Sequence, residues 1–190
     1  MNRTMLEQRD QIARHNEHFL QEQTVAKQVF DNITSGGHLN NPNLRYFMSP
    51  LAVFNGDVMV AATTPAGNLM VLLGDFTGHG LPAAIGAMPL ATTFYGMVGK
   101  GYSMADILSE INGKLKNLLP VGLFCCASMV EMNFRKSTVR IWNGGLPAAY
   151  IYRLGGSVEQ VKSTHLPLGV VGNKEFKADA ALYSLEEGER

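Results

Sequence analysis

The chain begins with a stretch in which apolar residues recur at helical spacing among polar ones. Seven positions separate each successive member of the series Met5, Ile12, Phe19, Ala26 and Ile33. Most positions between them are polar, with glutamine, glutamate and arginine frequent, so the pattern predicts one amphipathic helix over residues 5–33. Its apolar seam is narrow, and two interpretations stay open. The helix lies on its own domain, or it is a linker that dimerises or relays a signal from an upstream domain.

Beyond residue 33 the pattern alternates between strands and helices, which predicts one domain over residues 34–190. Strand-like segments are expected at 51–63, 69–73, 123–132, 138–142, 148–153 and 158–162. Helical spacing follows Gly80 and resumes after Ser103, which has Asp106 at the spacing of a capping box. Gaps of hairpin length favour antiparallel strands. The expected fold class is therefore α+β, with a helical pair inserted after the second strand.

Composition narrows the class of protein. Of the 190 residues 46% are hydrophobic, which suffices for a packed core, and the formal net charge of zero argues against nucleic-acid binding through bulk positive charge. No apolar run has the length of a membrane span, and the N-terminus lacks a signal-peptide core, so a cytoplasmic protein without membrane insertion is expected. The adjacent Cys125 and Cys126 are expected to be packed core thiols, since neighbouring cysteines rarely meet disulfide geometry.

Two aspartates stand out by position. Asp57 lies in a strand-like apolar run, Asp75 follows another, and a glycine precedes each of them. If these strands pair, the two carboxylates can project toward one point and hold a hard cation such as magnesium or manganese. The alternative from spacing alone is that Asp57 is an exposed strand residue and that Asp75 caps the turn after it.

A longer string favours the first interpretation. Residues 74–84 read GDFTGHGLPAA, which resembles the signature of the SpoIIE/RsbU-like bacterial branch of the protein phosphatase 2C superfamily, the metal-dependent serine/threonine phosphatases. Asn55-Gly56-Asp57 is similar to the first metal-binding Gly-Asp of that family. Ile111-Asn112, the NGGLP of residues 143–147 and the LPLGV of residues 166–170 are similar to further family motifs.

The resemblance implies two antiparallel sheets packed together and flanked by helices, an α-β-β-α sandwich, with two manganese or magnesium ions at one edge. Asp57 would contact both ions, and Asp75 one of them together with the backbone carbonyl of Phe76. Water between the ions would attack a phosphoserine or phosphothreonine. The residues expected in the loops of this site are Gly56, Gly74, Thr77, Gly78, His79 and Gly80. Whether His79 stabilises the turn or takes part in the reaction stays open; the other histidines are expected at the surface.

The resemblance also implies a setting: the output domain of a response regulator or sensor in two-component signalling and sigma-factor regulation. The implied substrate is a phosphorylated anti-sigma-factor antagonist with a STAS domain. The implied partners are a receiver or sensor domain upstream in the same chain and a second copy joined through the N-terminal helix.

Three departures from the family pattern leave a second function open. Val60 stands where the family has a second aspartate, Leu146 stands where its loop has a histidine, and its C-terminal metal aspartates do not occur. We therefore expect a domain truncated at its C-terminus, with weak metal binding and poor activity, because ligand count and charge set the affinity for hard cations. The alternative is a catalytically degenerate pseudophosphatase that acts as a partner-binding adaptor.

Overall fold

A computed structural model describes residues 3–34, 39–48, 56–78 and 80–189. The helices are α1 (Arg3–Thr34), α2 (Leu81–Val98) and α3 (Met104–Leu118), and the strands are β1 (Asp57–Thr63), β2 (Leu69–Phe76), β3 (Cys125–Asn133), β4 (Thr138–Gly144), β5 (Ala149–Tyr152), β6 (Val158–Val161) and β7 (Ala181–Ser184). The α+β class is confirmed. β7 was not predicted, and residues 51–55 of the first expected strand lie outside the described residues.

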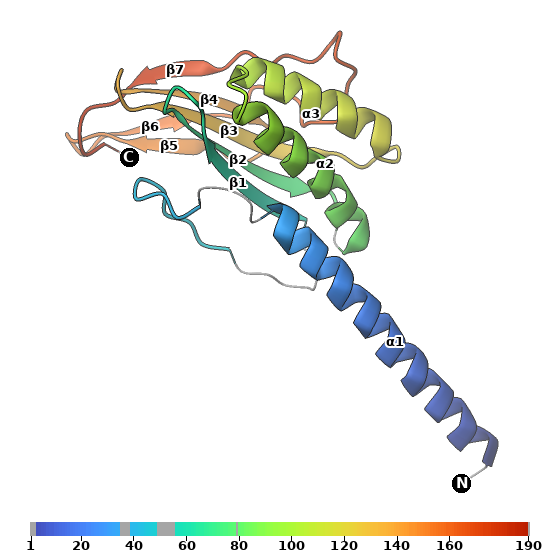
Figure 1. The fold of residues 1–190 in the computed structure, drawn as a ribbon. Helices are drawn as coiled ribbons and strands as arrows, with labels where there is room; N and C mark the ends of the chain where they lie inside the picture. Colours follow the sequence, from blue (N-terminus) through green and yellow to red (C-terminus); the bar gives the residue numbers. More distant parts are fainter. Residues whose placement is uncertain (1–2, 35–38, 49–55, 79, 190) are drawn as a thin grey trace.

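The strands form a five-stranded antiparallel sheet in the order β1-β2-β3-β4-β7 and a separate β5-β6 hairpin. Successive side chains of β4 point to opposite faces of the large sheet and pack in two different cores. Trp142 is fully buried in the core beneath α2 and α3, whereas Val139 and Ile141 join Ile151 of β5 and Val161 of β6 in a second core. The described residues thus make three layers: helices, the large sheet and the hairpin (Figure 1).

The helices predicted after Gly80 and after Ser103 both form, and α3 begins at the predicted cap. The Oγ of Ser103 accepts a hydrogen bond from the Asp106 N–H over 3.2 Å and caps α3, as the capping-box spacing predicts. The core side of α3 is fully buried, as at Ile111 and Leu115. Leu118, which continues the helical spacing of that face, is 62% exposed, because α3 ends there and the chain turns toward β3.

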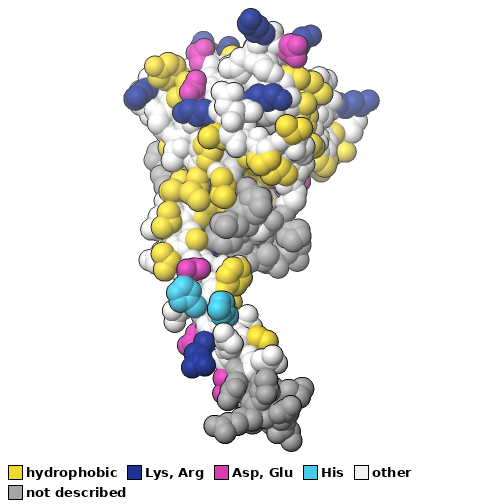
Figure 2. Space-filling model, turned by 90° about the vertical axis from the view of Figure 1, so that its right-hand side faces the viewer, with side chains coloured by type: hydrophobic (Ala, Val, Ile, Leu, Met, Phe, Trp, Pro, Cys, Tyr) yellow, Lys and Arg dark blue, Asp and Glu magenta, His cyan; other side chains and the backbone are white. Residues whose placement is uncertain are grey.

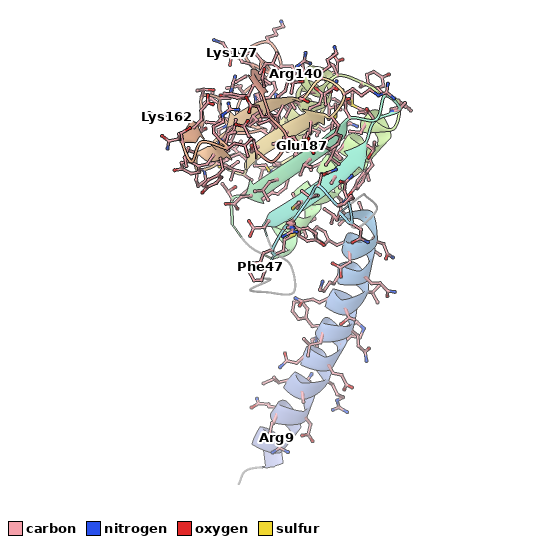
Figure 3. The ribbon with its side chains drawn as sticks, turned by 90° about the vertical axis from the view of Figure 1, so that its left-hand side faces the viewer. Arg9, Phe47, Arg140, Lys162, Lys177 and Glu187 are labelled. Atoms are coloured by element: carbon pink, nitrogen blue, oxygen red, sulfur yellow. The ribbon has the colours of Figure 1, made fainter. Side chains whose placement is uncertain are left out.

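Helix α1 leaves the body as a single rod, and only its C-terminal end packs on the domain (Figure 1). Phe30 is buried in the main core, whereas every residue from 8 to 22 is exposed. Figure 2 shows this stalk carrying histidines, charged side chains and scattered apolar side chains. Arg9 marks its free end, far from Arg140 and Lys177 at the opposite end of the molecule (Figure 3). Among the described residues, no helix combines the length and the apolar character needed to cross a membrane.

Candidate functional site

Strands β1 and β2 bring the two aspartates together. Asp57 lies directly opposite Asp75 in the antiparallel register. In the pair before them, the amide N–H of Phe76 donates to the carbonyl of Gly56 over 3.0 Å. Hydrogen-bonded and non-hydrogen-bonded pairs alternate along an antiparallel ladder, so Asp57 and Asp75 occupy a non-hydrogen-bonded pair, in which opposite side chains lie closest. Both residues are exposed at the end of the sheet next to α2.

Backbone oxygens surround Gly56 beside this pair. A Cβ atom at Gly56 would lie 2.7 Å from the carbonyl oxygen of Phe76, 2.9 Å from that of Gly78 and 3.6 Å from Oδ1 of Asp75. Only glycine leaves these oxygens room to approach one point. The Phe76 carbonyl was expected here from the family resemblance, while the Gly78 carbonyl was not predicted. Carboxylate and carbonyl oxygens are the donors that hard cations take.

The electrostatics of the pair are unfavourable without a cation. Burial raises the pKa of Asp75 above its ordinary value, and the nearby Asp57 carboxylate raises it further. Both causes disfavour a second negative charge at this edge. A bound divalent cation would remove that cost, because it places positive charge between the two carboxylates.

The turn after β2 is fastened to β3 rather than left free. The N–H of Thr77 donates to the Phe124 carbonyl over 3.0 Å, and the Thr77 Oγ1 accepts from the Phe124 N–H over 3.0 Å. Gly78 and Gly80 have φ values of 85° and 79°, a backbone conformation that residues other than glycine rarely adopt. Thr77 therefore holds the turn in place through its hydroxyl group. His79 lies outside the described residues.

Gly74 has a packing role instead of lining the site. A Cβ atom there would lie 2.9 Å from Sγ of Cys125 and 3.1 Å from Cγ1 of Val58. The glycine lets β2 approach the core beneath the helices. Val60 is fully buried on this same side of the sheet, so a carboxylate at position 60 would point away from Asp57 and into the core. The lack of an aspartate at position 60 therefore removes no ligand from the Asp57–Asp75 site.

Strand β3 adds a side chain that the sequence did not indicate. Cys126 pairs with Asp75 in register and stands beside it on the same face, whereas Cys125 points into the core and is fully buried. Both cysteines are free thiols, and the core prediction is right for Cys125 only; Cys126 is half-buried. Burial raises the pKa of Cys126, and Asp75 raises it further, which keeps the thiol protonated next to the carboxylates. Adjacent residues of a strand face opposite sides, and this separates the two thiols.

The described residues supply part of a metal site. They contain no group of three or more histidine, cysteine, aspartate or glutamate side chains able to hold a metal ion. What they offer is the Asp57 and Asp75 carboxylates with the carbonyls of Phe76 and Gly78. This all-oxygen set fits magnesium or manganese in kind, and its low charge fits weak binding.

One histidine is not at the surface as expected. The side chain of His165 is only 10% exposed, its Nε2 lies 3.4 Å from Oδ1 of Asp179, and its ring lies 5.5 Å from that of Trp142. It lines a cavity of about 250 Å³ together with Asn143, where β4 and β7 diverge. Asn143 belongs to the predicted NGGLP loop and donates from Nδ2 to the Pro147 carbonyl over 2.9 Å, which closes that turn. The other expected surface histidines that the structure describes, His15 and His18, are exposed.

Comparisons relate the chain to known proteins. The family described as stage II sporulation protein E (SpoIIE) matches residues 65–190, more than half of the chain. The phosphoserine phosphatase RsbP of Bacillus subtilis is 24% identical over 122 residues, which cover 62% of this chain and 30% of RsbP. The chain thus spans less than a third of the length of this curated relative.

Solved structures share the fold at low sequence identity. The SiaA-PP2C domain of Pseudomonas aeruginosa superposes with a TM-score of 0.75 at 17% identity, covering 92% of this chain and 70% of that one. The RsbU and RsbW domains of Rv1364c from Mycobacterium tuberculosis give a TM-score of 0.62 at 22% identity, over 75% of this chain and 38% of that one. RsbX, solved in complex with magnesium, gives 0.59 at 16% identity, over 71% and 63% of the two chains. The fold is that of protein phosphatase 2C domains.

Proposed function

The chain belongs to the family of stage II sporulation protein E, and from this premise we propose that it is a metal-dependent protein serine/threonine phosphatase domain. The observation that carries the proposal is the direct pairing of Asp57 with Asp75 beside the converging carbonyls of Phe76 and Gly78. Carboxylates placed together at an exposed sheet end are costly unless they bind a cation. Magnesium, which RsbX holds in its crystal structure, or manganese would be the ion.

Each residue of the site has a distinct task in this reaction. Asp57 and Asp75 would hold the ions, Phe76 and Gly78 would offer backbone oxygens, and Thr77 keeps the turn against the residue that precedes β3. When bound, such ions would supply a water of lowered pKa for in-line attack on phosphorus. As the new P–O bond forms, the bond to the seryl or threonyl oxygen would break, and that oxygen would take up the proton that the attacking water loses. No nucleophilic side chain is needed for this chemistry.

For the substrate, we propose a phosphorylated anti-sigma-factor antagonist of the STAS type. Two similar proteins support this proposal. RsbP is described as a phosphoserine phosphatase, and the Rv1364c structure contains both an RsbU and an RsbW domain. The setting we propose is cytoplasmic, with α1 linking residues 34–190 to an upstream receiver or sensor domain. Exposed apolar side chains such as Phe19 (57%) and Val25 (63%) favour a second copy of α1 as the partner of this helix.

A partner-binding adaptor without catalysis is the second candidate. It is favoured by the small ligand set, because the described residues bring only two carboxylates to the site. The argument from Val60 no longer supports it, since that position faces the core.

The deciding experiment measures manganese binding and turnover in the same preparations. Isothermal titration with MnCl₂ and hydrolysis of p-nitrophenyl phosphate and of a phosphoserine peptide are compared for the 190-residue chain and for Asp57→Asn and Asp75→Asn. Glu175→Gln, which removes an exposed carboxylate away from the site, is the matched control. The proposal requires manganese binding and slow turnover that both aspartate variants lose and the control keeps. Manganese binding without turnover in the 190-residue chain would favour the adaptor, and equal binding in all four proteins would end the metal assignment.

A further inference from the structure

Helix α3 carries a buried asparagine that the reaction does not use. Asn112 is fully buried on the core side of α3. Its Oδ1 accepts from the Gly169 N–H over 2.9 Å, and its Nδ2 donates to the Val171 carbonyl over 3.1 Å and to Oδ1 of Asn173 over 2.7 Å. Both amide hydrogens and the carbonyl oxygen are thus engaged. A buried polar side chain with this many partners holds them in one arrangement, because any other leaves polar groups unsatisfied.

The partners of Asn112 belong to one distant segment. They lie 57 to 61 positions further along the chain, between β6 and β7, where the chain runs beside α3 (Figure 1). Gly169 has a φ of 85°, and a Cβ atom there would lie 3.3 Å from Cβ of Leu115, so this segment lies directly against the helix. Asn112 is therefore a clamp between α3 and residues 168–173.

This segment in turn holds the start of β3. The Cys125 N–H donates to the Leu168 carbonyl over 3.0 Å, and the Leu168 N–H donates to the Cys125 carbonyl over 2.8 Å. Leu168 is fully buried and next to Gly169, which Asn112 holds. The bonded start of β3 therefore lies one residue from the amide that Asn112 binds.

The start of β3 is also what the aspartate site rests on. Phe124 makes the two amide hydrogen bonds with Thr77 described above, and Cys126 pairs with Asp75 in register. A contiguous series of hydrogen bonds thus runs from α3 through residues 168–169 and the start of β3 to the turn that follows Asp75.

We propose that Asn112 is a positioning residue for the Asp57–Asp75 site. It fixes residues 168–173, these fix the start of β3, and β3 fixes the turn after β2 so that the carbonyls of Phe76 and Gly78 stay beside the carboxylates. This role rests on the proposed function, because the Asp57–Asp75 site is a metal site only if that function is right. The structural coupling between Asn112 and the turn after β2 can be tested without measuring phosphatase activity. A leucine at position 112 would fill similar volume and leave three polar groups of the segment without their partner.

The test compares Asn112→Ala with a core variant of the same helix that leaves the hydrogen bonds of the segment intact. Ile107→Val removes a methyl group from a fully buried side chain five residues earlier on α3, and Asn173→Ala removes only one of the three bonds. Hydrogen exchange is measured at the amides of Leu168, Cys125, Phe124 and Thr77. We expect exchange to rise about tenfold in Asn112→Ala beyond the rise in Ile107→Val, and less in Asn173→Ala. Equal exchange at these amides in Asn112→Ala and Ile107→Val would overturn the proposal.

A second measurement asks whether the coupling reaches the site. Titration with MnCl₂ should show an affinity about tenfold weaker in Asn112→Ala and unchanged in Ile107→Val. If Asn112→Ala does not fold, Asn173→Ala is compared with Ile107→Val in its place. Raised exchange with unchanged manganese affinity would refute the positioning role. Raised exchange in a chain whose unsubstituted form binds no manganese would instead count against the proposed function and leave the coupling standing.

Discussion

Replacing Asp75 with asparagine should stabilise the metal-free protein while removing its response to manganese. Opposite Cβ atoms of a non-hydrogen-bonded pair lie about 5 Å apart. Two unit charges at that separation repel each other by about 0.8 kcal/mol in water. Both carboxylates are exposed, so the expected gain from Asp75→Asn is about 0.5 kcal/mol at low ionic strength and falls toward zero at about 1 M salt.

With manganese present, the unsubstituted protein should become more stable than Asp75→Asn. A cation that binds only the folded state adds about 2.7 kcal/mol when its concentration is about 100 times the dissociation constant. The unsubstituted protein should gain this stability, whereas Asp75→Asn should gain little, because asparagine removes half of the carboxylate charge at the site. The assay is urea unfolding followed by circular dichroism, with EDTA and with MnCl₂, each at low and high salt.

Two outcomes would contradict this reasoning. If Asp75→Asn destabilises the metal-free protein, the aspartate makes a favourable contact and the pair is not a repulsive cation site. If manganese stabilises both proteins equally, the ion binds elsewhere. Glu175→Gln serves as the control, since it changes the net charge by the same amount away from the pair.

Other positions give independent checks. Gly56→Ala should cost about 1–3 kcal/mol and abolish manganese binding, because its methyl group would stand 2.7 Å and 2.9 Å from two backbone oxygens; unchanged binding would show that those oxygens are not needed. His165 lowers the pKa of Asp179, so this pair should stabilise the fold above pH 3.8 and lose that contribution as the pH falls below it. Melting curves of the unsubstituted protein and of Asp179→Asn should therefore differ at pH 6 and converge in acid; a constant difference would refute the pairing. Ser103→Ala should cost about 1 kcal/mol through loss of the bond from the Asp106 N–H and leave manganese affinity unchanged; a change in affinity would mean that the cap acts on the site.

Much of this protein could be predicted from the sequence because the signals are local. Helical spacing, the Ser103 cap and strand alternation depend on residues a few positions apart, and the structure bears them out. The pairing of β1 with β2 also follows locally, because a five-residue turn joins them and directs Asp57 toward Asp75.

Features that depend on distant partners could not be found in this way. The short strand β7 is mostly exposed and has no alternating pattern, so only its pairing with β4 makes it a strand. His165 is buried because Trp142 and Asp179 meet there from other segments. Cys126 reaches Asp75 only through the register of β3 with β2, across an inserted helical pair.

The sequence by itself thus determined every helix and strand except β7 and which two acidic residues could share a cation, since backbone periodicity and turn chemistry act within a few residues. Only the tertiary structure decided what surrounds those residues. The oxygens around Gly56 and the buried clamp at Asn112 arise where segments far apart in the chain pack together. Such contacts are selected by shape and by the need to satisfy buried polar groups, and neither requirement leaves a periodic trace in the sequence.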